Sequence, residues 1–314
     1  MDSPQRAFRT SQLICLALLA VAGGSLSSCG GGGGGGGILH LPKIAFVSNR
    51  YGSDEIYVMD GDGSNQIRLT NDPEDDYQPV WSPDGTKIAY VQGSPPEGIY
   101  VMNADGSGNH RISNDPLSVG DGSPAWSPDG TKIAFASTTF TSDDQQAFGI
   151  YIMNSDGSGK VLLAQQPHLT TYDNPTWSPD GTKIAFDASD NVGNYQILVV
   201  NADGSNLTQL TAVAEQASQP RWSPLGSRIA YISSESGDYQ LYVMNADGSN
   251  RHRVTNDANA DTLPSWSPTA QWIVFTSIIN RVREQIYVVG ANGGTPVPLT
   301  HTQSNESNPS VAPH

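Results

Sequence analysis

The chain has 314 residues and a formal net charge of −15, from 16 Lys and Arg against 31 Asp and Glu. This length is near the upper limit for one hydrophobic core, and the acidic balance argues against a general nucleic-acid binder and against adhesion to anionic lipid through a basic surface. Two Cys are too few for a disulfide scaffold.

Residues 1–28 have the pattern of a secretory signal peptide. Two arginines precede an uninterrupted apolar run, 13–22, that is too short to span a bilayer, and small residues follow it. The sequence LSSC at 26–29 resembles the lipobox of bacterial lipoproteins. This resemblance implies cleavage before Cys29 and lipidation of its thiol; the alternative is an ordinary signal peptide with an incidental Cys.

Residues 29–41 are interpreted as a tether, because the Cys is followed by eight consecutive glycines, which have no side chains to form a core. In the lipoprotein pattern, a Gly directly after the Cys is associated with sorting to the outer membrane. We therefore expect a protein of the bacterial cell envelope, held by a lipid anchor on the periplasmic or outer face, with no other membrane contact.

From residue 42 onward, four short elements recur about every 45 residues. The first contains Trp-Ser-Pro, the second resembles Lys-Ile-Ala-Phe, the third resembles Ile-Tyr-Val-Met, and the fourth is a weaker apolar run. Each is rich in β-branched and aromatic residues and bounded by Gly, Pro, Asn and Asp, which is typical of strands. Four repeated strands predict the blades of a β-propeller. The repeated tryptophans, expected to pack between blades, are Trp81, Trp126, Trp177, Trp222 and Trp266.

The two ends of the repeat region predict how the ring closes. The repeats begin in mid-unit at Lys43, and the chain ends with a segment, 308–313, that matches the Trp-Ser-Pro element with Val311 in the Trp position. This last strand should pair beside residues 43–47 and complete a six-bladed, all-β propeller spanning 42–314. Closure would leave no open sheet edge where the termini meet.

The repeated sequence PxWSPDGxKIAF, followed by IYVMNxDG, resembles the WD-like propeller repeat of the TolB family. The resemblance covers about residues 42–313 and implies a six-bladed ring whose Trp-Ser-Pro strands line the central channel. Two features depart from the family. TolB has a separate α/β domain before its propeller and is soluble in the periplasm, whereas this chain has polyglycine and a lipobox-like sequence.

The loops favour one face of the ring as the binding surface. Uniform Asp-Gly turns join the first strand to the second and the third to the fourth, whereas the other connections are irregular and lie on the opposite face. On that face, the residue five positions before each Trp position is acidic in four of six repeats. In the third repeat this residue is Tyr172, and an acidic residue, Asp173, directly follows it. The positions are Asp76, Asp121, Tyr172, Ala217, Asp261 and Glu306.

We expect these residues to surround the channel mouth. A ring of carboxylates would attract a cation, with Ca²⁺ as the candidate, or a basic peptide segment. The alternative interpretation is a solvated acidic rim without a ligand, and no other cofactor is expected.

The sequence predicts a non-catalytic, monomeric scaffold that binds an envelope protein or peptide at the irregular face and the channel mouth, and no nucleic acid. It contains no Gly-x-Ser-x-Gly, phosphate-binding or His-Glu-x-x-His motif, and its six His are scattered over different repeats. One alternative is a propeller enzyme or glycan-binding protein similar to the polysaccharide lyases. Another is a surface spacer with no specific ligand.

Overall fold

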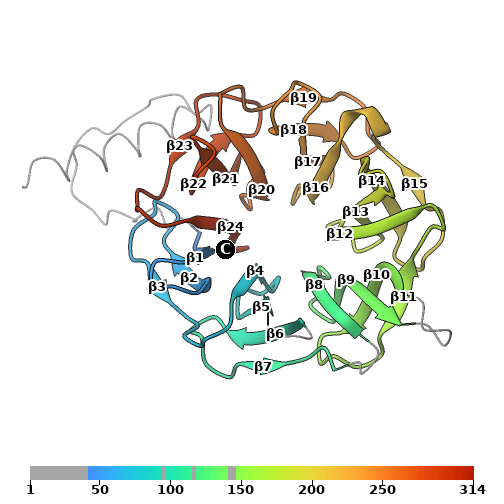
Figure 1. The fold of residues 1–314 in the computed structure, drawn as a ribbon, viewed down its shortest axis with the longest axis horizontal. Coiled ribbons are helices and arrows are strands. Elements are labelled where there is room, and N and C mark those ends of the chain that lie inside the picture. Colours follow the sequence, from blue (N-terminus) through green and yellow to red (C-terminus); the bar gives the residue numbers. More distant parts are fainter. Residues whose placement is uncertain (1–41, 94–96, 115–117, 141–145) are drawn as a thin grey trace, which may run out of the picture.

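The computed structural model describes residues 42–93, 97–114, 118–140 and 146–314. These residues form six four-stranded antiparallel sheets arranged in a ring, which confirms the predicted six-bladed β-propeller (Figure 1). The predicted signal peptide, Cys29 and the glycine tether lie outside the described residues. No helix within the described part of the chain is long and apolar enough to cross a membrane.

Each blade contributes one strand to the centre of the ring and three strands that follow outward (Figure 1). The innermost strands are β24 (Glu306–Val311), β4 (Asp76–Trp81), β8 (Ser118–Trp126), β12 (Leu169–Trp177), β16 (Ala217–Trp222) and β20 (Ala260–Trp266), in blades 1 to 6. The second strands are β1 (Ile44–Ser48), β5 (Lys87–Gln92), β9 (Lys132–Phe140), β13 (Lys183–Asp190), β17 (Arg228–Ser233) and β21 (Trp272–Ile279).

The outer half of each blade is more exposed, and its last strand is mostly very short. The third strands are β2 (Glu55–Met59), β6 (Gly98–Asn103), β10 (Gln146–Asn154), β14 (Tyr195–Asn201), β18 (Gln240–Asn245) and β22 (Arg283–Gly290). The fourth strands are β3 (Ile67–Arg68), β7 (His110–Arg111), β11 (Val161–Ala164), β15 (Thr208–Gln209), β19 (His252–Arg253) and β23 (Val297–Pro298). One 3₁₀ helix, Val213–Glu215, precedes β16.

The second strands carry the core of each blade, because both faces of these strands are covered. Each contributes one fully buried aromatic residue at the fourth position of the Lys-Ile-Ala-Phe element: Phe46, Tyr90, Phe135, Phe186, Tyr231 and Phe275. In every blade this ring lies 5.6–6.1 Å, centroid to centroid, from a tyrosine at a tilted angle. The recurrence shows that one aromatic pair per repeat fills each blade.

Ring closure occurs as expected from the two ends of the chain. Strand β24 pairs antiparallel with β1, placing Val311 opposite Ile44 and Glu306 opposite Ser48. The backbone N–H of Ala312 also donates to the Lys43 carbonyl at 2.8 Å. The first blade is therefore built from both ends of the repeat region, so β1 has a partner on each side.

Three of the five repeated tryptophans connect neighbouring blades through their indole nitrogens, whereas those of Trp126 and Trp222 have no partner in the described chain. Trp81 Nε1 donates to the Ser310 carbonyl at 3.1 Å, and Trp177 Nε1 donates to the Ala125 carbonyl at the same distance. Trp266 Nε1 donates to the carbonyl of a residue in β16 at 2.9 Å. Each acceptor belongs to the innermost strand of the preceding blade, so these three tryptophans form contacts between blades.

Candidate functional site: the central channel and the irregular-loop face

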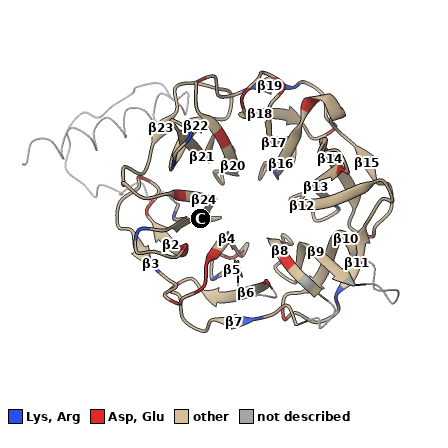
Figure 2. Ribbon diagram, in the orientation of Figure 1, with Lys and Arg blue, Asp and Glu red and all other residues tan. Residues whose placement is uncertain are grey.

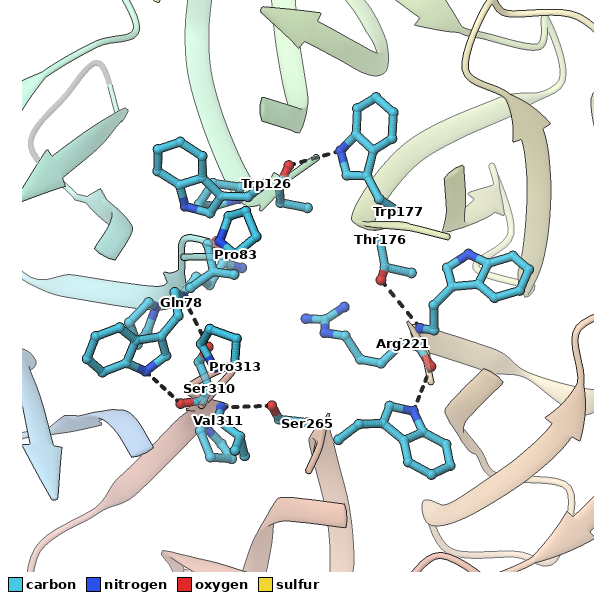
Figure 3. Close-up of a pocket in the computed structure, with 18 of the residues that line it drawn as sticks. Gln78, Pro83, Trp126, Thr176, Trp177, Arg221, Ser265, Ser310, Val311 and Pro313 are labelled. Carbon is cyan, nitrogen blue, oxygen red and sulfur yellow. Dashed lines mark hydrogen bonds between the residues drawn. The ribbon is translucent and has the colours of Figure 1, made fainter. Parts of the chain in front are cut away.

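A cavity of about 430 Å³ lies on the axis of the ring and is lined by residues from all six innermost strands (Figure 3). In five of the six blades its lining begins at the residue that precedes the first Pro of the repeat, and in blade 5 it begins at Arg221. It reaches the Pro of the following turn at positions such as Pro83 and Pro313. The five repeat tryptophans also border it. The confirmed ring thus brings six copies of one sequence element to a single polar and aromatic cavity.

One backbone feature recurs at this cavity in every blade. The residue before the first Pro of each repeat has a positive φ of 51–55°, and the pairing register shifts beside it. A β-bulge bends the strand and redirects a side chain, and its sixfold repetition makes it part of the fold rather than an isolated strain. The residues are Gln78, Ser123, Asn174, Gln219, Leu263 and Asn308, and all of them except Gln219 line the cavity.

Hydrogen bonds at the bulges join each blade to the next. Gln78 Oε1 accepts from the Ser123 backbone N–H at 2.7 Å, and Gln219 Oε1 accepts from the Leu263 backbone N–H at 2.7 Å. Because an amide oxygen accepts and its nitrogen donates, this contact fixes which end of each side chain is which. Neither amide nitrogen donates a hydrogen bond to another described residue. Of the two, only Gln78 lines the cavity, where its amide nitrogen remains as a donor.

Arg221 is the only charged residue among the described residues that line the cavity (Figure 3). Arg221 directly precedes the Trp of its repeat. In the other five blades this position carries a small or apolar side chain: Val80, Ala125, Thr176, Ser265 and Ser310. Arg221 Nη1 donates to the Pro220 carbonyl at 2.9 Å. Burial lowers the pKa of Arg221, but a guanidinium remains charged at neutral pH.

Two acidic residues of blade 4 act on this guanidinium from outside the cavity lining. Asp187 stands opposite Asp173 in the register of β12 and β13, and Asp173 accepts a short hydrogen bond from the Ser123 hydroxyl. Burial, followed by the charge of Asp173, raises the pKa of Asp187 well above that of an ordinary aspartate. Asp187 accordingly compensates the charge of Arg221 less than a surface aspartate would.

The structure places the predicted acidic ring inside the blades rather than on the channel wall. Asp76, Asp121, Asp261 and Glu306 are each at most 1% exposed, and none of them lines the cavity. Figure 2 shows the corresponding acidic segments on four innermost strands, β4, β8, β20 and β24. These four carboxylates therefore do not form a shared channel mouth, because each is buried and none reaches the axial cavity.

The four carboxylates have separate environments. Glu306 pairs with the Arg50 guanidinium at 2.9 Å, and Asp121 pairs with the Lys160 ammonium at 3.2 Å. The carboxylate oxygens of Asp76 and Asp261 accept no hydrogen bond within the described part of the chain. Burial raises the pKa of each of these two residues to about 7. These carboxyls are isolated from one another and do not act as one ring.

The remaining two predicted residues lie in blade 4. Tyr172 is buried at 6% exposure, and its hydroxyl donates to the Gln166 carbonyl at 3.1 Å. Asp173 contacts Ser123 of the neighbouring blade, as described above. Within the described ranges, no group of three or more His, Cys, Asp or Glu side chains could hold a metal ion. The proposed Ca²⁺ therefore finds no ready-made ligand cluster among these residues.

The irregular-loop face is defined by the connections from the second to the third strand of each blade and from each blade to the next. It exposes large apolar side chains at Tyr51, Val192, Tyr195, Val213, Tyr239 and Val282, and Val282 is 81% exposed. The opposite face, the turn face, exposes Leu225. More of the large exposed apolar side chains of the described chain therefore lie on the irregular-loop face than on the turn face.

The residues that the sequence interpretation missed are Arg221 and the six bulge residues. Two signals for them were present in the sequence. Each bulge residue precedes a Pro in an innermost strand. Pro has no backbone N–H and is tolerated there because the innermost strand is the edge of its sheet. Arg221 is the one charged residue at its repeat position. Neither signal states which side chains face the axis.

The fold and the axial cavity define a six-bladed propeller with a channel suited to binding. The chain matches the family described as the TolB beta propeller domain over residues 42–236 and 212–314, and it belongs to that family. It is 35% identical over 163 residues to a protein named TolB homolog from Chlorobium luteolum, covering 50% of this chain and 34% of that protein. The chain thus matches about a third of the length of this relative.

Solved structures show the same fold. TolB from Acinetobacter baumannii superposes with a TM-score of 0.74 at 22% identity, covering 87% of this chain and 67% of that chain. An oligogalacturonate lyase from Vibrio parahaemolyticus superposes with a TM-score of 0.60 at 16% identity, covering 83% of this chain and 75% of that chain. At these identities the likeness concerns the fold alone.

Proposed function

We propose that this protein is a non-catalytic scaffold of the bacterial cell envelope that binds a protein or peptide partner on its irregular-loop face. The observation that carries the proposal is the distribution of exposed apolar side chains. Of the ten large hydrophobic residues exposed within the described part of the chain, the six named above lie on this face. A partner would cover them, and aromatic residues such as Tyr51 and Tyr239 are favoured at interface centres.

The path of the chain supports this orientation. Lys43 enters blade 1 on the turn face, where its ammonium contacts the Asp60 carboxylate, in the turn between β2 and β3, at 2.9 Å. A lipid anchor at Cys29 would therefore be attached through the turn face, and the irregular-loop face would be left clear of the attachment. The family membership and relatives named TolB homolog agree with an envelope role.

The test compares variants on the two faces. The triple variant Tyr51→Ser, Tyr239→Ser and Val282→Ser removes apolar surface from three loops of the irregular-loop face. Leu225→Ser makes the same kind of change on the turn face, where Leu225 is 72% exposed. After crosslinking of intact envelopes, purification of the wild type and the Leu225 variant should recover the same partner.

The triple variant should lose that partner while its thermal unfolding remains unchanged. Equal recovery by all three proteins would overturn the proposal.

A further inference from the structure

The channel differs in charge from the rest of the molecule. The chain carries a net charge of −15, yet the only charged side chain among the described residues that line the axial cavity is the cation Arg221. Figure 3 shows this side chain extending from β16 into the open centre of the cavity. A cation surrounded by tryptophan and proline is poorly screened by solvent, so an anion that reaches it interacts more strongly than at the surface.

The cavity presents a second hydrogen-bond donor on another strand. Gln78, on β4, uses its amide oxygen to accept from the backbone N–H of Ser123, as described above, so its amide nitrogen remains as a donor at the cavity. The Arg221 guanidinium donates a single hydrogen bond, to the Pro220 carbonyl, and no carboxylate in the described chain forms an ion pair with it. Several N–H groups thus point into one small space.

Asp173 and Asp187 lie near enough for their charges to act on Arg221, but neither forms an ion pair with it or lines the cavity. Asp173 is engaged by the Ser123 hydroxyl and by the Asn174 backbone N–H. Asp187 accepts from the Gln219 backbone N–H at 2.8 Å and does not line the cavity. A guanidinium with several N–H groups and no ion pair, in a cavity where it is the one charged lining residue of the described chain, matches the chemistry of a carboxylate, which accepts from several N–H groups at once.

We propose that the axial cavity binds a carboxylate of a peptide, from an acidic side chain or a free C-terminus, and that Arg221 is the residue that recognises it. The choice of a peptide rests on the proposed function, because apolar loops suited to a protein partner surround the channel on one face. The acidic residues of the sequence predicted a channel that binds a cation. Those carboxylates are buried in the blades, and the channel carries Arg221 and binds an anion.

Short peptides test the site without a known partner. The probes are acetyl-Gly-Gly-Glu-Gly-Gly-amide, its Gln counterpart without any carboxylate, and acetyl-pentaglycine with a free C-terminus. Trigalacturonate provides a carboxylate that is not a peptide. Binding is read from the intrinsic fluorescence of the tryptophans that line the cavity, and is checked by calorimetry. The first and third probes distinguish a side-chain carboxylate from a terminal one.

At least one of the two carboxylate peptides should bind at least about tenfold more tightly than the Gln peptide, because a hydrogen bond to a charged group is worth more than one to a neutral amide. Arg221→Gln should abolish this preference. Arg221→Lys should keep part of it, since an ammonium retains the charge without the planar fork. The matched control is Lys183→Gln, which removes one exposed positive charge on β13 outside the cavity and should leave binding unchanged.

The selectivity of the wild type for a carboxylate needs no variant, so a folding defect in the Arg221 variants would not obscure the result. Equal affinity for all three peptides, no peptide binding at millimolar concentration, or binding of trigalacturonate alone would each overturn the inference. The irregular-face variants separate the two proposals. If the triple variant loses the partner and still binds the carboxylate peptide, both proposals stand. If it keeps the partner while the wild type selects a carboxylate, the channel inference stands and the proposed function fails. If it loses the partner while the wild type shows no preference for a carboxylate, only the proposed function stands.

Discussion

The burial of Asp76 and Asp261 predicts that the protein loses stability as the pH rises through neutrality. The pKa of each carboxyl is raised from 3.8 to about 7 by burial. Asp76 lacks a donor for a specific reason: the nearby Thr70 hydroxyl donates to Glu55 instead, at 2.7 Å. The folded state therefore holds a proton that the unfolded state has already released above pH 4, and ionisation of the buried group favours unfolding.

The magnitude follows from these pKa values. Between pH 5 and pH 8, a carboxyl with a folded pKa of 7 and an unfolded pKa of 3.8 removes about 2.5 kcal/mol from the free energy of unfolding. The stabilisation is complete below pH 4 and lost once the pH exceeds 7. Asp187, whose pKa is also raised by burial, acts with the same sign.

Urea unfolding at several pH values between 5 and 8 measures this effect. Asp76→Asn and Asp261→Asn should each flatten the pH dependence by about 2.5 kcal/mol, and the double variant should flatten it by about twice that amount, because the two sites lie in blades 2 and 6 and share no partner. Asp105→Asn, at an exposed turn, is the control and should leave the slope unchanged. A wild-type stability that is constant or rises over this range would refute the reasoning.

Two further predictions concern the contacts between blades. Deletion of 305–314 removes β24 and should abolish cooperative folding, measured by thermal unfolding, whereas deletion of His314 alone should have no effect; a stable, cooperatively folded 1–304 protein would contradict this. Trp177→Phe loses an indole hydrogen bond to blade 3 and should cost about 1 kcal/mol more in urea unfolding than Trp222→Phe, whose indole nitrogen has no partner in the described chain. Equal costs for the two variants would show that packing alone matters.

The repeat pattern was sufficient to predict the fold because each blade repeats the same local chemistry. The Lys-Ile-Ala-Phe element marks a strand covered on both faces, and the Asp-Gly turns mark its ends. The match between 308–313 and the Trp-Ser-Pro element predicted the closing strand, and the pairing of Val311 with Ile44 confirms it. Long-range closure was readable here only because the missing strand of the first repeat appears at the other end of the chain.

The candidate site was less predictable, because a strand pattern does not say which side chains face the axis. Asp76 and Gln78 lie two positions apart at the start of β4. Simple strand alternation would therefore place both side chains on the same face. A bulge with positive φ at Gln78 turns that side chain to the channel, while Asp76 stays buried opposite Gln92. The sequence contained a useful second signal, since Ser48, Ser137 and Ser277 face the other acidic positions across the register and suggest enclosed polar contacts.

The most direct test of the proposed function is site-specific photocrosslinking from the two faces of the ring in living cells. A benzoylphenylalanine at Tyr239, 47% exposed on the irregular-loop face, should form one specific protein adduct in the envelope. The same group at Leu225 on the turn face should form none with that protein. An adduct from Leu225 in place of Tyr239, or the same adducts from both positions, would contradict the assignment of the partner to the irregular-loop face.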